Sequence, residues 1–552
     1  MKNFQKSILL SLLVTAVVGA VLFYVWLPVL NVKSVGFWMY VIFLLAFFIG
    51  MYEIGLLIFR SWHERGQQRV ALGAAAAIGV IFVVMIVLVF FSGTMFHAKS
   101  YSSLLKVDED RDFETDMSET LSTDAIAIMD TKSARKLGNR KLGSLSSLVS
   151  QYNVSEDYSQ INYQNTPVKV AALDYAGFFK YMKNRKSGIP GYVLVSPVNM
   201  SANYVSFEKN LHYVPSGYFS DNLMRHIRFG YPTKMIANIN FEIDEEGKPY
   251  YIASVRDYTI GLFGGEDIVG AILVDPVSGD MKYYDVSQVP RWVDIVYDGD
   301  LLCDQYDYFG QLRNGYWNAH LSAEGCKVTT DDYGYVALED DIWVYTGVTS
   351  VNNDASNIGF VLMNERTKEA RFYSIPGADE ASAMSAAEGE VQQYKYQASF
   401  PSLINVDGNA TYIMVLKDSG GLVKMYAAVN AEQYNIVATA GNQKDCINKY
   451  RRIMANGGVE SEELQNAGNA SDSSGTQSEP EEEIDETLYE EVEVTVRKME
   501  QIVVEGNTYL YLLTEEGNTY HAKYVDVLDM MQVEEGDKIT IRVYEDRFLC
   551  VE

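Results

Sequence analysis

The chain is poor in the residue types that most often build metal and catalytic sites. It has six histidines and four cysteines among 552 residues, without the Cys/His spacing of a zinc site. His63 and Glu64 begin like an HExxH motif, but Gln67 stands where the second histidine is required. A GxSxG elbow and a Walker loop are also missing. We therefore predict no metal, no cofactor and no catalytic residue.

Positive charge is also scarce. Lys and Arg number 45 against 73 Asp and Glu, which gives a formal net charge of -28 at pH 7. This charge repels phosphate backbones and excludes nucleic acid as a partner. It also repels anionic lipid headgroups, so we expect the soluble part to stand off the bilayer. Cations, basic proteins and neutral glycans stay open as partners.

Long apolar runs, by contrast, are plentiful at the N-terminus. Three of them are Ile8–Leu30, Gly36–Phe59 and Val70–Phe91, and a spanning helix needs roughly 20 apolar residues. The first run is too long for a signal peptide, and its small residues are followed by more apolar ones. We predict that residues 1–97 form a three-helix anchor of a multi-pass protein in the cell membrane.

Basic residues predict the orientation of this anchor. They gather before the first run and between the second and third, which lie on one side of the membrane if all three runs cross it. The turn between the first two runs carries only Lys33. We therefore expect a cytoplasmic N-terminus and an extracytoplasmic location for everything after Phe96. The residues of the basic side are Lys2, Lys6, Arg60, Arg65 and Arg69.

Glu53 is the one acidic residue within the three apolar runs. An intramembrane carboxylate is a functional candidate by default; an ion pair with Arg60 or with the N-terminal lysines is the structural alternative. The runs also carry small residues four apart, such as Ser11, Thr15 and Gly19, which let helices approach closely. This pattern favours packing of the three spans on one another, with an oligomer through the spans as the alternative.

Two of the four cysteines are candidates for a disulfide. Cys303 and Cys326 are near enough in sequence to pair in an oxidising compartment, and two buried thiols are the alternative. Cys446 and Cys550 lie in different predicted units. We interpret them as thiols of two separate cores.

Residues 98–124 are predicted to be an acidic juxtamembrane spacer. Asp108, Asp110 and Asp112 have the spacing of a calcium loop, and Glu119 falls at the place of its last ligand. Such a loop needs a glycine at its sharp turn, where this chain has Phe113. A solvated acidic segment is therefore favoured over a calcium site.

Residues 125–456 read as an α+β domain of repeated units. Four segments share an aliphatic strand, a polar turn and a second strand, which is the pattern of a β-hairpin. They are Gly191–Phe207, Gly270–Val286, Gly359–Ile375 and Tyr412–Val429. Spacing of roughly 50 to 90 residues favours repeated small antiparallel sheets with helices, and not a tight solenoid. The predicted helices are Tyr175–Arg185, Tyr218–Phe229 and Ala378–Val391.

The hairpin turn at Asp275, Pro276, Ser278 and Gly279 resembles that of the PepSY domain, a small extracytoplasmic module of bacterial proteins. The whole chain is similar to a family of uncharacterised multi-span membrane proteins of Gram-positive anaerobes. The PepSY resemblance implies a module that acts on a peptidase. The second family has no established activity, so it implies no functional residue.

The C-terminal part is predicted to contain a tether and a barrel. Residues 457–487 are rich in Glu, Ser, Gly, Asn and Asp, which is typical of a disordered acidic linker. Residues 488–552 contain five short strand-like runs separated by turns. We predict a small β-barrel of the OB or SH3-like kind. Barrels of the OB kind often bind oligonucleotides or oligosaccharides, and the acidic charge leaves glycan or protein as the expected ligand.

The favoured function is non-enzymatic. We predict a membrane-anchored protein of the cell envelope whose extracytoplasmic repeats bind a protein or a glycan. The alternatives are an envelope enzyme or a PepSY-type regulator of a peptidase, and an accessory subunit of a membrane transporter that uses Glu53. Neighbouring carboxylates such as Asp340 and Asp341, or Asp244 and Glu245, have the chemistry for acid–base work, but acidic turns between strands are far commoner.

Overall fold

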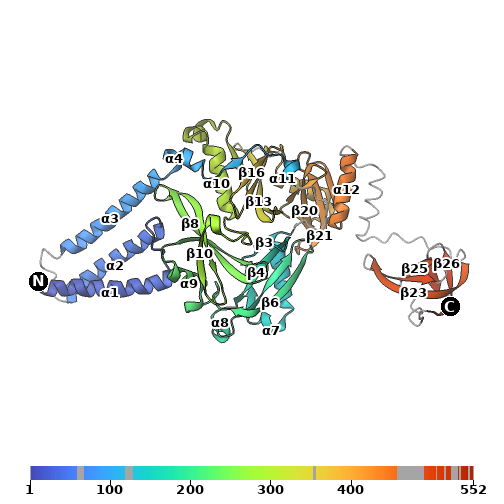
Figure 1. Cartoon of the computed structure of the whole chain (residues 1–552), viewed down its shortest axis with the longest axis horizontal. Helices are drawn as coiled ribbons and strands as arrows, with labels where there is room; N and C mark the ends of the chain where they lie inside the picture. The colour runs from blue at the N-terminus through green and yellow to red at the C-terminus, as the bar shows by residue number, and fades with distance from the viewer. Residues whose placement is uncertain are drawn as a thin grey trace. The chain divides into compact units, whose positions relative to one another are not determined.

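The computed structural model has two compact units, residues 1–460 and 461–552. It describes residues 2–58, 68–117, 129–351, 356–456, 490–504, 507–514, 518–523, 533, 536–544 and 547–550. The fold is α+β, as predicted, with three long helices at the N-terminus and sheets through most of the remainder (Figure 1). The predicted linker at 457–487 lies outside the described residues.

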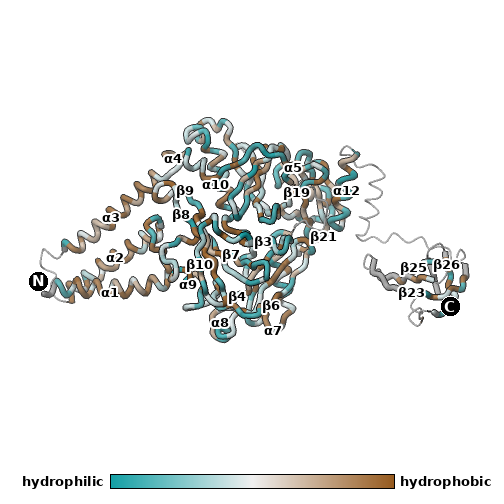
Figure 2. The backbone as a smooth tube through the Cα atoms, viewed as in Figure 1, coloured by the Kyte–Doolittle hydropathy of each residue, from teal (hydrophilic) through white to brown (hydrophobic). Residues whose placement is uncertain are grey.

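Three long apolar helices are present at the N-terminus, as expected for a membrane anchor. They are α1 (Lys2–Trp26), α2 (Val35–Ile58) and α3 (Gln68–Phe91). Each is long and apolar enough to cross a bilayer, since a helix rises 1.5 Å per residue and the hydrocarbon core is about 30 Å thick. Figure 2 shows that the apolar residues cover these helices along their length. The remainder of the first unit, from α4 (Thr94–Tyr101) to α12 (Gln443–Ala455), is called the large domain. The side of the membrane on which it lies stays a prediction.

Small residues bring α1 and α2 together. A side chain at Gly55 would press on Ser7 and Ser11, and one at Gly19 would touch Leu44 and Tyr40. The Tyr40 hydroxyl donates a hydrogen bond to the Gly19 carbonyl at 2.8 Å. This is the close approach that small residues permit in lipid.

Loops of the large domain hold the ends of the spans. In the turn after α1, Lys33 pairs with Asp257 at 2.8 Å. Ser92, directly after α3, accepts a hydrogen bond from the Leu262 backbone N–H at 3.1 Å. Leu262 belongs to the glycine-rich segment Gly261–Gly265, where the chain turns between two antiparallel strands. A side chain at Gly261 or Gly264 would collide with Ser92, so glycine permits this contact between domain and span.

Four large, mainly antiparallel sheets follow one another in the described part of the first unit, each built largely from consecutive strands. A small two-stranded sheet pairs β14 (Ser356–Asn357) with β17 (Gly377–Ala378). The first sheet contains β2 (Tyr152–Val154), β3 (Ser159–Tyr163), β4 (Thr166–Tyr175), β5 (Ile189–Ser196) and β6 (Ser201–Leu211). The second contains β7 (Met235–Ile243), β8 (Pro249–Ile260), β9 (Gly264–Val274) and β10 (Met281–Asp285). The third contains β11 (Lys327–Thr329), β12 (Gly334–Leu338), β13 (Asp341–Ser350), β15 (Gly359–Asn364) and β16 (Ala370–Tyr373), with β1 (Val107–Asp108) added in parallel. The fourth contains β18 (Gln397–Ala398), β19 (Ser402–Val406), β20 (Asn409–Lys417), β21 (Val423–Asn430) and β22 (Val437–Ala440).

A helix follows each sheet, and apolar cores join neighbouring layers. These helices are α9 (Leu223–Gly230), α10 (Gly299–Leu312), α11 (Glu380–Glu390) and α12 (Gln443–Ala455). One core lies between the first and second sheets. A second core joins the second and third sheets with α10, and a third joins the third and fourth with α11. Helix α12 covers the far side of the fourth sheet (Figure 1).

The four predicted hairpins are all present, formed by β5–β6, β9–β10, β15–β16 and β20–β21. Two of them share one turn geometry. Asp275 and Asn364 each accept hydrogen bonds from two following backbone N–H groups. Four residues later, Gly279 and Lys368 adopt positive φ angles of 81° and 65°. This common geometry explains the similar sequences; descent of the units from one repeat stays a prediction.

Helix predictions were correct where the apolar pattern was clear. Residues 178–184 form α8 (Phe178–Asn184), and 219–230 form a 3-10 turn, η2 (Phe219–Asp221), followed by α9. Helix α11 matches its predicted range closely. Sequence reasoning missed α6 (Thr131–Gly143), α10 and α12, although an Asp or Asn side chain caps the N-terminus of each.

The described part of the predicted acidic spacer differs from a solvated segment. Helix α4 (Thr94–Tyr101) continues from α3, and β1 pairs with β16. Phe113 and Met117 are buried in the core between the third and fourth sheets. Asp108 accepts a hydrogen bond from Arg111 at 2.8 Å, and Glu119 lies outside the described residues. Apolar side chains between the acids therefore fix this segment to the domain.

The second unit is a closed five-stranded barrel, in the order β23–β24–β25–β27–β26. The strands are β23 (Glu490–Val504), β24 (Asn507–Thr514), β25 (Thr519–Lys523), β26 (Lys538–Tyr544) and β27 (Arg547–Cys550). A small apolar core that includes Val496, Leu512 and Ile541 fills it. All five predicted strands are present. Whether the barrel is of the OB or SH3-like kind stays a prediction.

Candidate functional site

The side chains predicted as functional candidates do not gather in one place. Glu53 is half-buried on α2, within a span. Cys303 is half-buried on α10 and Cys326 is buried; both are free thiols in the structure, and their pairing stays a prediction. Among the described residues, no three His, Cys, Asp or Glu side chains form a group that could hold a metal ion.

Two of the neighbouring carboxylates considered for acid–base work, Asp341 and Asp244, have structural partners. Both oxygens of Asp341 bind the Arg366 guanidinium, at 2.7 and 2.6 Å. Asp244 accepts two backbone hydrogen bonds within the β7–β8 turn. These contacts place Asp341 in an ion pair and Asp244 in a turn.

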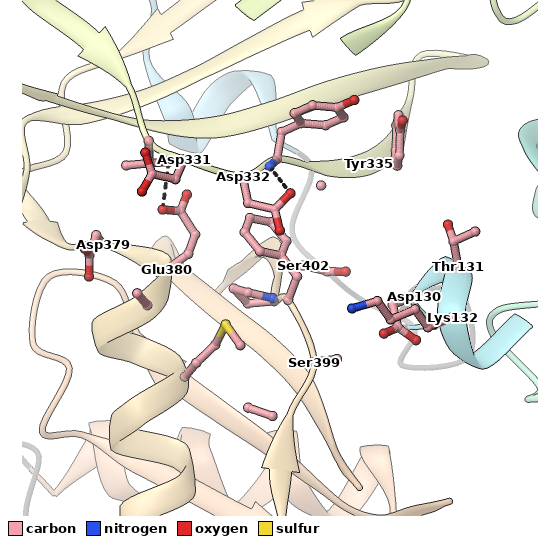
Figure 3. A pocket seen from close by; sticks show the side chains of 18 of the residues that line it. Asp130, Thr131, Lys132, Asp331, Asp332, Tyr335, Asp379, Glu380, Ser399 and Ser402 are labelled. Carbon is pink, nitrogen blue, oxygen red and sulfur yellow. Dashed lines mark hydrogen bonds between the residues drawn. The ribbon is translucent and has the colours of Figure 1, made fainter. Parts of the chain in front are cut away.

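A pocket of about 840 Å³ opens where the first, third and fourth sheets meet. It lies between the start of α6, the β11–β12 loop, the start of α11 and the β18–β19 loop. Figure 3 shows Asp130, Thr131 and Lys132 on one side, and Asp331, Asp379 and Glu380 on the other. The remaining lining includes hydroxyl side chains and the rings of Tyr333, Tyr335 and Phe400. It is the candidate site because polar groups of both signs converge on it.

One wall of the pocket, which we call the donor wall, presents Lys169, Gln160, Thr131 and Lys132. Lys169 and Gln160 are directly opposite each other on β4 and β3, and are 3% and 6% exposed. The Gln160 Nε2 atom is buried without a hydrogen-bond partner. A buried amide donor left unpaired is costly, so Gln160 is a candidate donor to a ligand in the pocket.

Lys169 is the most deeply buried residue of the donor wall. Its Nζ lies 3.3 Å from the Thr131 hydroxyl and 5.7 Å from the centre of the Tyr335 ring. Burial lowers the pKa of Lys169 to about 8, although the Asp130 and Glu365 carboxylates partly counteract this. The ammonium form therefore prevails at neutral pH, with a neutral fraction that grows under mildly alkaline conditions.

The opposite wall, which we call the acceptor wall, consists of Asp331, Asp332, Asp379 and Glu380. The Glu380 carboxylate accepts the Gly347 N–H at 2.7 Å and the Thr330 hydroxyl at 3.1 Å. Burial raises the pKa of Glu380 despite these bonds. Asp379 caps α11, and Asp331 and Asp332 are exposed on their loop. Within the described part of the chain, none of the four forms an ion pair. Asp331 and Asp332 therefore present negative charge to the pocket.

Three further carboxylates are buried behind Lys169: Glu242, Asp294 and Glu365. The Glu242 side chain accepts the backbone N–H groups of Asp294 and Ile295, at 2.9 and 3.1 Å. Burial nevertheless raises the pKa of Glu242 to about 8. It raises the pKa of Glu365 as well, and the Glu365 Oε2 atom has no hydrogen-bond partner. Burial therefore favours the protonated form of these acids more than it does in exposed carboxyls.

Sequence reasoning missed the pocket because its walls come from distant segments. Lys169 and Gln160 stand in strands where polar residues ordinarily face solvent. The one available signal was the pair Asp331 and Asp332, followed by Tyr333 and Gly334, in a loop rich in turn residues. Burial of a lysine opposite a glutamine depends on the packing of three sheets.

Comparisons with known proteins give little further information. No family model and no curated protein matches the chain. It is similar to one solved structure, "putative exo-beta-1,3-galactanase from Bifidobacterium bifidum s17", at 9% identity over 54% of this chain and 74% of that chain. The TM-score is 0.17. At these values the likeness indicates neither a shared fold nor a shared activity.

Proposed function

We propose that the protein is an integral membrane protein of the cell envelope whose large domain binds a partner outside the cell. The pocket between the donor and acceptor walls supports this proposal, and the unpartnered Gln160 Nε2 beside buried Lys169 carries it. The partner groups that match are a carboxylate or carbonyl against the donor wall and an ammonium group against the acceptor wall. A peptide end or a peptide-bearing glycan of the envelope has both.

The physical reason lies in the separation of charge across the pocket. Lys169 and Lys132 attract an anionic group, and a buried amine gains more from that contact than an exposed one does because solvent screens it less. Asp331 and Asp332 attract an ammonium group from the other side. The rings of Tyr333, Tyr335 and Phe400 add apolar area on which a side chain or a sugar ring can pack.

The test is binding by the full chain in lipid nanodiscs, measured by calorimetry. The probes are short peptides that end in lysine, and soluble cell-wall fragments with and without their peptides. We expect Lys169→Met to weaken binding of the peptide-bearing probes at least about tenfold, because a buried charged hydrogen bond contributes roughly 1.5–3 kcal/mol. Asp331→Asn with Asp332→Asn should weaken it by a smaller factor.

A matched control is available in the β7–β8 turn, where Glu245 and Glu246 are also exposed neighbouring carboxylates. Glu245→Gln with Glu246→Gln should leave binding unchanged. Equal binding by wild type and Lys169→Met, both folded, would rule out the pocket as the binding site. Binding of peptide-free glycans alone would retain the pocket but exclude a peptide ligand.

One observation favours a second candidate, an envelope enzyme. A buried lysine of lowered pKa that lines a pocket is the kind of amine that condenses with carbonyl substrates. Borohydride reduction of the protein in the presence of small aldehydes and ketones tests this. Lys169 selectively converted to a secondary amine, with turnover of the same carbonyl compound, would establish enzymatic chemistry. Modification of exposed lysines alone would exclude it.

A further inference from the structure

A group of large apolar side chains is exposed close to the membrane spans. It comes from α8, η2 and α9 and is called the aromatic face. Its most exposed member is Phe179, with 84% of its surface accessible. The residues of the aromatic face are Phe178, Phe179, Met182, Tyr218, Phe219 and Phe229. An exposed apolar patch of this kind marks a binding surface more often than a chance cluster.

The fold holds these side chains outward. Tyr181, on the opposite side of α8, is completely buried, and its hydroxyl hydrogen-bonds the Tyr218 carbonyl and the Asp221 carboxylate, at 2.9 and 2.8 Å. The ring of Phe178 packs edge-on against that of Tyr218, with centroids 5.1 Å apart. The aromatic face is therefore a fixed part of the surface of the domain.

The aromatic face is continuous with the first span. The Phe229 ring contacts Phe23 and Tyr24 of α1 edge-on, with centroids 5.6 and 6.2 Å apart. Arg225 links the two regions. Its guanidinium lies 4.4 Å from the centre of the Tyr24 ring, and it donates hydrogen bonds to the carbonyls of Tyr24 and Phe219. Since α1 ends at Trp26, this contact lies at the end of the span that meets the domain.

The charge around α8 is opposite to that of the whole chain. Residues 176–188 contain four basic side chains and no acid, in a chain of net charge -28. Lys183 and Lys186 are exposed, and Lys180 and Arg185 are half-buried. A basic segment with aromatic side chains beside a membrane span is typical of elements that lie in the lipid interface.

We propose that the aromatic face and the basic residues of α8 dock onto the leaflet of the membrane that faces the large domain, with anionic lipid headgroups as the ligand. The aromatic rings enter the headgroup region beside α1, where amphipathic rings are most stable. Lys183 and Lys186 contact headgroup phosphates. The acidic remainder of the domain is repelled, so the contact also sets the tilt of the domain relative to the bilayer.

The test uses the full chain, reconstituted in vesicles of equal parts phosphatidylcholine and phosphatidylglycerol. A photo-reactive p-benzoylphenylalanine replaces Phe179, and in a control it replaces Tyr434, an exposed aromatic residue between β21 and β22. After illumination, lipid adducts are quantified by mass spectrometry. We expect lipid adducts at position 179 to exceed those at position 434 at least about tenfold, with phosphatidylglycerol above its share of the mixture.

Charge reversal distinguishes the contribution of the basic residues to the lipid contact from that of the aromatic residues. Lys183→Glu with Lys186→Glu, in the Phe179 photo-probe variant, should retain the lipid adduct but remove the preference for phosphatidylglycerol. Equal lipid adducts at positions 179 and 434 would overturn the proposal. So would illumination of living cells that yields a protein cross-link at position 179 in place of lipid. A lipid preference unchanged by charge reversal would overturn the assignment of phosphate contacts to Lys183 and Lys186.

Discussion

The two ends of the large domain differ in the sign and the burial of their charged side chains. Beside the spans, α8 presents exposed lysines and aromatic rings, and Lys33 pairs with Asp257 where solvent still reaches both. At the pocket, carboxylates predominate, and Glu242, Asp294 and Glu365 are buried behind a buried lysine. Net charge alone would assign the same behaviour to both ends. In the two proposals above, the placement of a few cations decides what each surface attracts.

The two ends also differ in how far solvent screens their charges. At the membrane end, Lys33, Asp257, Lys183 and Lys186 are at least partly exposed, so each contributes little to stability. Arg228 is buried there, but it donates hydrogen bonds to the carbonyls of Leu27 and Lys234. At the pocket end, burial changes which groups carry a proton. The stability of the domain should therefore depend on pH through the pocket end.

The largest expected effect follows from Glu242. Its pKa is raised by burial to about 8 in the folded protein, so the folded state keeps a proton that the unfolded chain loses near pH 4.5. The contribution of Glu242 to stability is therefore largest at low pH and falls as pH rises towards 8. We expect a loss on the order of 3 kcal/mol between about pH 5 and about pH 8. Thermal unfolding of the full chain at the two pH values measures it.

Glu242→Gln isolates this contribution, because a glutamine oxygen can still accept a backbone hydrogen bond but cannot ionise. The difference in melting temperature between the two pH values should shrink in this variant. Glu245→Gln, on the adjacent exposed turn, should leave it unchanged. A pH dependence that is the same in wild type and Glu242→Gln would show that Glu242 is not the responsible group.

A second prediction concerns the contact between the large domain and the end of α3. Gly264→Val places a side chain against the Ser92 carbonyl and the Tyr101 hydroxyl. We expect a loss of about 2 kcal/mol at this contact, as for other overpacked sites. Hydrogen exchange of residues 262–265 should accelerate, while exchange around the pocket stays unchanged. Gly441→Val is the control, since a Cβ there meets nothing within 4 Å. Faster exchange throughout the domain would mean that the two ends unfold together.

The elements that the sequence predicted well have strong local signals. The spans are continuous apolar runs, and the hairpin at Asp275 has a turn whose hydrogen bonds are made by its own side chain and backbone. The barrel strands are separated by acidic and glycine-rich stretches of sequence. In each case neighbouring residues determine the structure, so a single sequence is sufficient.

The elements that it missed depend on packing. Helix α6 buries Ala134, Gly138 and Leu142 among polar residues, a weak pattern that tertiary contacts stabilise. The pocket needs Lys169 and Glu380, 211 residues apart in the numbering, to face one space. The prediction of a solvated acidic juxtamembrane spacer was wrong for the same reason. Phe113 is an isolated apolar residue in an acidic segment, and only the folded domain shows the core that buries it.

The smallest expected effect is that of removing an exposed ion pair at the membrane end. Lys33 and Asp257 are 2.8 Å apart, with side chains 30% and 36% exposed. Lys33→Met should cost only about 0.5 kcal/mol, because solvent screens the pair and freezing a lysine opposes its gain. A double-mutant cycle with Asp257→Asn, read by thermal unfolding at low and high salt, isolates the coupling. Coupling above about 2 kcal/mol, or coupling insensitive to salt, would mean that lipid or protein excludes water from this end as well. The contrast between a screened membrane end and a buried pocket end would then fail.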